Sequence, residues 1–229
     1  MIQVLPYVSA ALAGYFLGAL PFGWLVARAH GVDIFKEGSG NPGATNVKRV
    51  LGDKFGARGR RAGNLVFGLD VLKGVLAAGW ALVYFTDATM TWDFGDGAVA
   101  TVTGESWRLL GLAGVIGAVL GHSFSLFTRF KGGKGVATAA GGVLVLMPAA
   151  CLIGAVVWVL TFYTTRYVSL GSIIAAVVVP ALGWVLGHPL PLNIVVTLLG
   201  LFVIVRHREN IKRLLAGTEN KFAKKASGD

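Results

Sequence analysis

Four segments of this sequence combine glycines, cations and small polar side chains in a way that suits phosphate binding. The first covers residues 38–49 and includes Gly38, Ser39, Gly40, Asn41 and Gly43. A Gly-x-Gly-x-x-Gly pattern also marks dinucleotide-binding βαβ units, but those need a preceding strand, whereas a long apolar stretch precedes this one. The dinucleotide interpretation is therefore excluded. The physical one remains, because glycines let backbone N–H groups approach an anion closely.

A short helix is predicted to follow, with Asn41 as N-cap, Pro42 in the first turn and Gly52 beyond its end. Its apolar face carries Ala44, Val47 and Leu51, and its polar face carries Thr45, Asn46 and Arg49. The N-terminus of such a helix favours a phosphate. The alternative is a solvated loop followed by an ordinary surface helix.

The second segment, residues 128–136, places two lysines among three glycines at the start of a predicted helix: Lys131, Gly132, Gly133, Lys134 and Gly135. It does not match the P-loop pattern, since the upstream glycine is missing and Gly135 stands where Ser or Thr should follow the lysine. ATP or GTP binding is not supported, but an anion cradle is.

The third segment, residues 206–221, leaves the last apolar stretch as a short helix that should stop at Gly217. His207 and Asn210 share one face, which Arg213 continues. The alternative is a basic tail that snorkels toward the membrane surface. In the fourth segment, residues 165–172, Ser169 and Ser172 face one way at helical spacing.

Three further ionisable residues lie in or beside apolar stretches. Asp70 and Lys73 are three apart within one stretch, where ionisable groups are costly unless they pair or face water. A structural ion pair and a functional one fit this spacing equally well. His122 fits a satisfied histidine at a helix end better than a catalytic one.

Composition identifies the medium that surrounds these segments. The chain has 229 residues, of which 55% are hydrophobic and only 14% charged, whereas a soluble domain has about 25% charged residues. Seven apolar stretches are predicted to be helices, four of them close to the roughly 20 residues that cross a bilayer: 4–29, 62–85, 107–127, 136–147, 149–164, 168–187 and 190–205. The stretch at 136–147 is alternatively a re-entrant half-span. The fold class is an all-α integral membrane protein forming one domain over residues 1–229.

Charge placement predicts the orientation. The net charge is +10, and with seven spans all Lys and Arg except Lys73 and Arg108 fall on one side. That side is cytoplasmic by the positive-inside rule, so the N-terminus is outside and nucleic-acid binding is not indicated. The cytoplasmic segments are 36–61, 128–136, 165–172 and 206–221, and an acidic loop over 86–106 lies outside. Small-residue spacings at Gly14/Gly18, Gly117/Gly121 and Gly183/Gly187 predict close helix contacts. The single cysteine, Cys151, is expected to be buried and inert.

In this order, the segments resemble the acyl-phosphate-dependent glycerol-3-phosphate acyltransferase family of bacterial membranes. The similarity covers nearly the whole chain and rests on residues 38–49, 70–74, 121–138, 169–172 and 207–221. It implies seven spans with an outside N-terminus in the cell (inner) membrane. It also implies transfer of a fatty acyl group from acyl phosphate to the 1-hydroxyl of glycerol 3-phosphate. The products are lysophosphatidate and inorganic phosphate, in the first committed step of phospholipid synthesis.

Acyl phosphate is already activated, so positioning of the two substrates can supply much of the catalysis. The hypothesis assigns phosphate clamping to Ser39, Arg49, Lys134, His207 and Asn210, with backbone donors at Gly40, Gly43, Gly133 and Gly135. The base that accepts the hydroxyl proton is either His207 or the phosphate of the acyl donor, and we favour the phosphate. No His-x-x-x-x-Asp pair is present, since Phe127 stands where the aspartate would follow His122. No cofactor or metal is expected, and the partners are the two substrates and membrane lipid, bound to a monomer.

Two other functions remain open from the residues themselves. A transporter of a phosphorylated anion needs polar access from both faces and often shows two repeats, neither of which this sequence displays. A scaffold that recognises anionic lipid headgroups explains the basic charge but not the glycine-rich segments.

Overall fold

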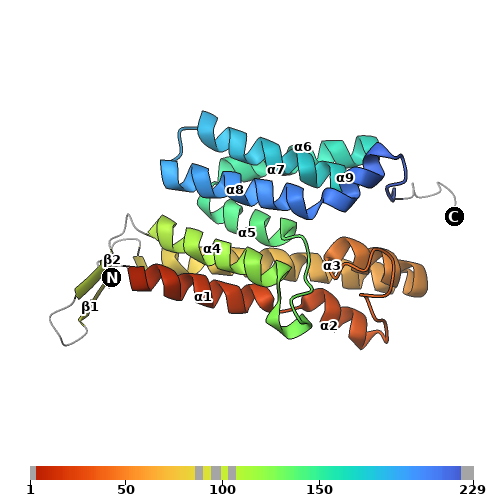
Figure 1. The fold of residues 1–229 in the computed structure, drawn as a ribbon, viewed down its shortest axis with the longest axis horizontal. Coiled ribbons are helices and arrows are strands. Elements are labelled where there is room, and N and C mark those ends of the chain that lie inside the picture. The colour runs from red at the N-terminus through yellow and green to blue at the C-terminus, as the bar shows by residue number, and fades with distance from the viewer. Residues whose placement is uncertain (1–3, 86–89, 94–98, 103–106, 223–229) are drawn as a thin grey trace. The chain divides into compact units, whose positions relative to one another are not determined.

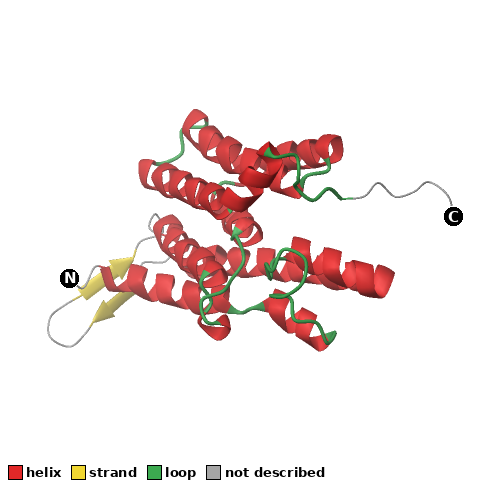
Figure 2. Ribbon diagram, turned by 45° about the vertical axis from the view of Figure 1, so that its right-hand side comes forward, coloured by secondary structure: helices red, strands yellow, loops and turns green. Residues whose placement is uncertain are grey.

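The computed structural model describes residues 4–85, 90–93, 99–102 and 107–222. Helices dominate, and two short strands form the other regular structure (Figure 1, Figure 2). The chain divides into two compact units, Met1–Met147 and Pro148–Asp229. Within each unit, helices pack against one another. The single membrane domain over residues 1–229 stays a prediction.

The first unit is built on close contact between α1 (Leu5–Ala19) and α4 (Trp107–Ser123). A Cβ atom at Gly14 would lie 2.1 Å from the Gly114 carbonyl oxygen, and one at Gly117 would lie 1.9 Å from that of Ala11. Only glycine permits this approach, so the predicted helix contacts at Gly14/Gly18 and Gly117/Gly121 are confirmed. The prediction for Gly183/Gly187 is wrong at Gly187, which has φ +68° and where an added Cβ would meet no atom within 4 Å.

A break interrupts the first predicted span between α1 and α2 (Phe22–Ala29). Leu20 has ψ 114° and lies outside the helical region. Its neighbour Pro21 explains this, because a proline ring disfavours helical geometry at the residue before it. The stretch 4–29 is therefore two helices rather than one.

The next helix, α3 (Ala44–Phe85), holds both the predicted short helix and the second predicted span. Gly56, with φ 58° and ψ −131°, interrupts it. A Cβ at Gly59 would lie 1.8 Å from the Leu51 carbonyl oxygen, so the segments on either side of Gly56 pack against each other. The predicted helix exists, but its bounds are wrong, since it begins at Ala44 and passes through Gly52.

After α3 the chain forms an antiparallel hairpin of β1 (Met90–Asp93) and β2 (Val99–Val102). The sequence predicted only a loop over 86–106, whose remaining residues lie outside the described part of the chain. The 3-10 helix η3 (Leu126–Thr128) and α5 (Val136–Leu146) complete the unit, and α3 packs against α5.

The second unit contains α6 (Pro148–Thr165), α7 (Val168–Val185), α8 (Leu190–Arg206) and α9 (Arg208–Leu215). The predicted separation of the stretches 136–147 and 149–164 is confirmed, because α5 ends at Leu146 and α6 begins at Pro148. Within the unit, α7 packs against both α6 and α8. The axis bends by 57° between α8 and α9. The tail helix ends as predicted before Gly217, which has φ +68°.

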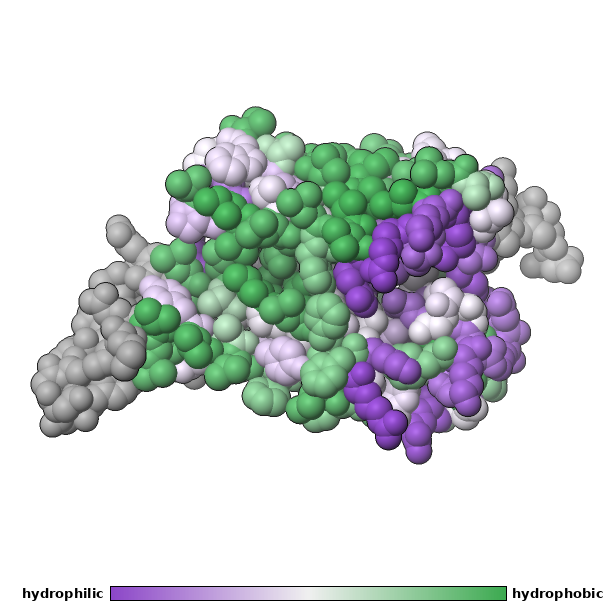
Figure 3. Space-filling view, viewed as in Figure 1, coloured by the Kyte–Doolittle hydropathy of each residue, from purple (hydrophilic) through white to green (hydrophobic). Residues whose placement is uncertain are grey.

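Among the described residues, five helices are long and apolar enough to cross a membrane, or six if α8 and α9 count as one span. Seven spans are not confirmed, because α5 has only 11 residues and α8 passes as a span only together with α9. Figure 3 shows hydrophilic surface over α2 and its neighbouring loops in the first unit, and over α9 in the second. On the face shown, α1 and α4 in the first unit and α8 in the second present mainly hydrophobic surface, which suits contact with lipid.

Candidate active site

The first glycine-rich segment forms a loop between α2 and α3. Val32 and Ile34 anchor it in a buried cluster that includes Ala27, Val47 and Leu51. The predicted apolar face of the helix is therefore confirmed at Val47 and Leu51, which are fully buried. Gly38 and Gly40 both have positive φ, at 58° and 66°, so the backbone turns at each side of the exposed Ser39.

Asn46 organises this loop from the first turns of α3. Its Oδ1 accepts a hydrogen bond from the Ser39 N–H at 2.9 Å, and its Nδ2 donates to the Glu37 carbonyl oxygen at 3.0 Å. A Cβ at Gly38 would lie 2.3 Å from the same Oδ1. The side chain is only 3% exposed. Asn46 was predicted to share a polar surface with Thr45 and Arg49, but it is buried and holds Ser39 in place, whereas those two are half-buried.

The start of α3 also differs from the prediction. Asn41 was expected to be the N-cap, but its Oδ1 accepts from the Gly43 N–H at 2.8 Å, and the Gly43 carbonyl accepts from the N–H groups of Asn46 and Val47. Asn41 therefore closes an Asx turn, and the helix begins two residues after Pro42. Short polar side chains suit both roles, so the sequence pattern did not separate them.

The second glycine-rich segment is tied to the C-terminal end of α4 and to η3. The Thr128 hydroxyl donates to the Lys131 carbonyl at 2.6 Å, and the Phe130 N–H donates to the Ser125 carbonyl at 2.8 Å. Gly135 is the N-cap of α5 and has φ 82°, a left-handed conformation that glycine adopts without strain. Lys134, half-buried, precedes it.

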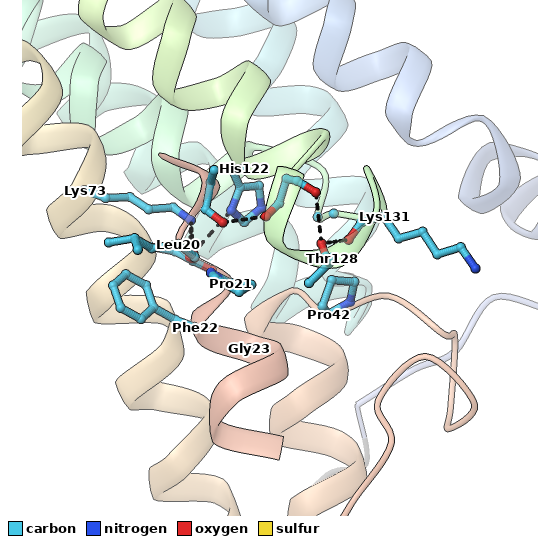
Figure 4. Close-up of a pocket in the computed structure, with 14 residues that line it drawn as sticks. Leu20, Pro21, Phe22, Gly23, Pro42, Lys73, His122, Thr128 and Lys131 are labelled. Carbon is cyan, nitrogen blue, oxygen red and sulfur yellow. Dashed lines mark hydrogen bonds and ion pairs between the residues drawn. The ribbon is translucent and has the colours of Figure 1, made fainter. Parts of the chain in front are cut away.

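The two glycine-rich segments contribute to one cavity in the first unit. Pro42 comes from the first segment and Lys131, Gly132 and Gly133 from the second. The remaining lining residues come from the α1–α2 break, α3, the end of α4 and η3 with its N-cap. In Figure 4 the Lys131 side chain extends away from the other labelled residues, so only its backbone belongs to the cavity wall. The sequence did not predict that Asp70, Lys73 and His122 would line the same cavity.

Three backbone N–H groups that were predicted to bind phosphate have partners within the chain. The amide of Gly40 donates to Glu37 O, that of Gly43 to Asn41 Oδ1 and that of Gly133 to His122 O. In this conformation the three glycines allow tight turns and close packing, and their N–H groups donate within the chain rather than to an anion. The cations Arg49 and Lys134 and the hydroxyl of Ser39 therefore remain the stronger anion-binding candidates of the first unit.

In the second unit, a carboxylate that the sequence did not reveal collects three predicted site residues. Glu219 Oε1 accepts from Ser169 Oγ at 2.8 Å and from Asn210 Nδ2 at 2.7 Å, and Oε2 accepts from Arg213 Nε at 2.7 Å. We call Glu219 with Ser169, Asn210 and Arg213 the Glu219 cluster. The predicted shared face of Asn210 and Arg213 is thus confirmed.

Glu219 is ionised because of these partners. Burial raises the pKa of its carboxyl group. Hydrogen bonds from Asn210, Ser169 and Arg213, together with the charge of Arg213, lower the pKa by more than burial raises it, so the net pKa lies below the ordinary value. The signal available in the sequence was an acidic residue two positions after Gly217 in a basic segment.

His207 and Ser172 each make hydrogen bonds within the second unit. His207, only 3% exposed, uses Nδ1 to donate to the Val203 carbonyl at 2.8 Å. A carbonyl only accepts, so Nδ1 carries the proton, and in the neutral ring the lone pair lies on Nε2. The Ser172 hydroxyl donates to Val168 O and accepts from Trp158 Nε1, which gives it a local structural role. In the described residues, no three His, Cys, Asp or Glu side chains gather as a metal site requires.

Comparison with known proteins places this geometry in context. Residues 8–217 match the family model described as glycerol-3-phosphate acyltransferase. The glycerol-3-phosphate acyltransferase of Aquifex aeolicus is 41% identical over 208 residues, which cover 91% of this chain and 95% of that protein.

Two crystal structures of PlsY (YgiH), an integral membrane glycerol 3-phosphate acyltransferase, are similar to this chain. The glycerol 3-phosphate form is 38% identical with a TM-score of 0.78, covering 95% of this chain and 96% of that one. The lysophosphatidic acid form, also 38% identical, has a TM-score of 0.75 and covers 95% of both chains. All four segments singled out in the sequence lie within or overlap the matched residues.

Proposed function

Because the chain belongs to the glycerol-3-phosphate acyltransferase family, we propose that it takes its acyl group from acyl phosphate and transfers it to the 1-hydroxyl of sn-glycerol 3-phosphate. The observation that supports this most strongly is the match over residues 8–217, which includes nearly all the phosphate-suited segments. Family membership makes the chain an acyltransferase of the membrane, so transport of a phosphorylated anion is no longer the alternative. The remaining choice concerns the donor.

The proposed reaction is a direct transfer. The 1-hydroxyl oxygen of glycerol 3-phosphate forms a bond to the acyl carbonyl carbon, and the bond from that carbon to the phosphate oxygen breaks. Phosphate leaves with the electron pair of the broken bond, and the hydroxyl proton passes to it. The products are lysophosphatidate and inorganic phosphate. The named relative in its lysophosphatidic acid form supports this assignment of the product.

In the first unit, we assign substrate phosphate binding to Ser39, Arg49 and Lys134. Asn46 holds the Ser39 backbone at 2.9 Å, and Arg49 follows one turn later on the same helix. Lys134 stands between the glycine pair and the N-terminus of α5. A cation there adds to the attraction that a helix N-terminus exerts on an anion.

In the second unit, His207 and Asn210 are the assigned catalytic side chains. The Nδ1 bond to Val203 orients the His207 ring, and the Glu219 cluster orients Asn210. The departing phosphate accepts the hydroxyl proton, and His207 positions the substrate. A His207→Gln enzyme should therefore keep most of its kcat. A loss of about a thousandfold or more with normal substrate binding would assign the proton transfer to histidine.

The enzyme is proposed to act as a monomer on the cytoplasmic face of the inner membrane. The positive-inside rule supports the cytoplasmic face, because the basic residues of 36–61, 128–136 and 206–221 would all lie on that side. Both glycerol 3-phosphate and inorganic phosphate are then handled in the aqueous compartment that holds them. The acyl chain stays in the lipid.

The donor is tested with the purified full chain in detergent. Acyl phosphate and acyl-CoA are supplied in parallel with glycerol 3-phosphate, and lysophosphatidate, phosphate and free CoA are quantified. We expect lysophosphatidate and phosphate in equal amounts from acyl phosphate, and none from acyl-CoA. Lysophosphatidate from acyl-CoA alone would overturn the proposed donor while leaving the family assignment intact. Lys134→Ala, which removes an assigned phosphate ligand, serves as the low-activity control.

A further inference from the structure

Three ionisable side chains lie buried together in the first unit, where α3 passes the end of α4. Lys73 Nζ is 2.9 Å from Asp70 Oδ1, and His122 Nδ1 is 3.5 Å from the same oxygen (Figure 4). The side chains of Lys73, Asp70 and His122 are 2%, 4% and 10% exposed. Ionisable groups at such positions are retained for a structural or functional reason. The two ends of this group contact different parts of the unit.

The lysine end supports the break in the first span. Lys73 Nζ donates to the carbonyls of Gly18 at 2.9 Å and Leu20 at 3.3 Å, and Ser125 Oγ donates to that of Ala19 at 2.5 Å. These carbonyls lie at the end of α1, where the helix pattern stops before Pro21. A broken helix in a membrane needs such donors. This end of the group is structural.

The histidine end contacts the glycine pair of the second segment. A Cβ at Gly133 would lie 2.0 Å from His122 Nε2, and a Cβ at Gly132 would lie 2.1 Å from the His122 carbonyl oxygen. The Gly133 N–H donates to that carbonyl at 3.0 Å. The ring therefore occupies the space that any side chain at position 133 would need. The backbone before Lys134 is held by both the ring and the carbonyl of His122.

We propose that His122 is a positioning residue, held by Asp70, that sets the backbone of Gly132 and Gly133 and thereby places Lys134 for substrate phosphate. The identity of that ligand rests on the proposed function. Removing the ring frees the glycine pair to move, while the Asp70–Lys73 ion pair and the α1 carbonyl contacts stay in place. His122 thus acts on binding through the loop, not on the reacting atoms.

A double-mutant cycle tests this coupling on the full chain in detergent. Gly133→Ala places a methyl group on the His122 ring and should raise the KM for glycerol 3-phosphate or for the donor about tenfold, with kcat changed less than about threefold. With His122→Ala, which alone should raise the same KM about fivefold, the added Gly133→Ala should cost less than about threefold, because the ring is gone. Gly68→Ala is the matched control, since nothing lies within 4 Å of a Cβ there.

A second readout does not depend on the donor. Amide hydrogen exchange of peptides covering residues 128–137 should become at least about fivefold faster in His122→Ala than in the wild type. His122→Asn, whose amide nitrogen replaces Nδ1 toward Asp70, should restore part of the protection. If His122→Ala does not fold, the cycle is run with His122→Asn.

Multiplicative effects of the two substitutions on KM, together with unchanged exchange in the loop, would overturn the proposal. A wild-type enzyme that ignores acyl phosphate would contradict only the proposed donor, because the exchange result still reports on the loop.

Discussion

Two buried carboxylates, Asp70 and Glu219, anchor the two units in different ways. Asp70 lies inside α3 and pairs with Lys73 one turn away, next to His122. Glu219 lies beyond the last helix and gathers Ser169, Asn210 and Arg213 from two helices of its unit. Asp70 neutralises a cation that is buried inside the first unit, whereas Glu219 orients polar groups outside the long helices of the second. The first contact protects the fold, and the second fixes the directions of predicted site residues.

Of the two carboxylates, Asp70 should contribute more to the free energy of unfolding. Asp70→Ala leaves Lys73 buried without its counter-charge, so we expect the folded state to lose about 3–5 kcal/mol, measured as a lower unfolding temperature in detergent. Replacing both residues, as Asp70→Ala with Lys73→Met, should recover part of the loss. Equal stability of Asp70→Ala and wild type would show that the pair does not protect the fold.

Removing Glu219 should act on catalysis at the second unit. Glu219→Ala releases Asn210 and Arg213 from charge-assisted hydrogen bonds worth about 3 kcal/mol together, so kcat/KM should fall about a hundredfold. Glu209→Ala is the matched control, because Glu209 is 57% exposed and its ion pairs with Arg208 and Lys212 lie along α9. Equal losses in the two variants would refute a special role for Glu219.

The ionisation of Glu219 adds a pH dependence. Its pKa is lower in the folded state than in the unfolded chain, so its contribution to stability is fully present above the ordinary glutamate pKa. That contribution is lost as the pH falls through the lower, folded-state value. We expect wild-type stability in detergent to drop over this acid range, and the drop to shrink in Glu219→Gln. An identical acid profile for both proteins would contradict the shift.

A weaker effect is expected at the loop that Asn46 holds. Asn46→Ala removes hydrogen bonds to the backbone at Ser39 and Glu37, worth about 1–2 kcal/mol because water can replace part of them. The KM for one substrate should rise about tenfold while kcat changes little. Asn64→Ala, at an exposed position of the same helix, is the control and should match the wild type. An unchanged KM in Asn46→Ala would separate the loop from substrate binding.

The contrast between these residues also shows what the sequence could predict. The spacing of Asp70 and Lys73 displayed their pairing, because residues three apart on a helix share a face. The contact of Asp70 with His122, and that of Glu219 with Ser169, joins residues about fifty positions apart, and no local pattern encodes such a contact. The sequence therefore identified the polar segments and the Asp70–Lys73 pair, but not the contacts of Asp70 with His122 and of Glu219 with Ser169.

The errors in the predicted fold, in contrast, have local causes. Hydropathy continued through Pro21, so the break in the first span was missed, although proline was a visible signal. Gly52 was taken as a helix end, whereas the interruption lies at Gly56, where positive φ is required. Composition predicted the membrane class correctly, because no packing detail is needed to see that so apolar a chain requires lipid.

Isotope exchange can decide whether the acyl group passes directly from one bound substrate to the other. Purified wild-type enzyme is incubated with acyl phosphate and radiolabelled inorganic phosphate, without glycerol 3-phosphate, and label in acyl phosphate is measured. Direct transfer predicts no exchange above that of Lys134→Ala, because the acyl group leaves phosphate only for the glycerol hydroxyl. Exchange at a rate comparable to turnover would contradict direct transfer, since it would reveal an acyl group held covalently by the enzyme.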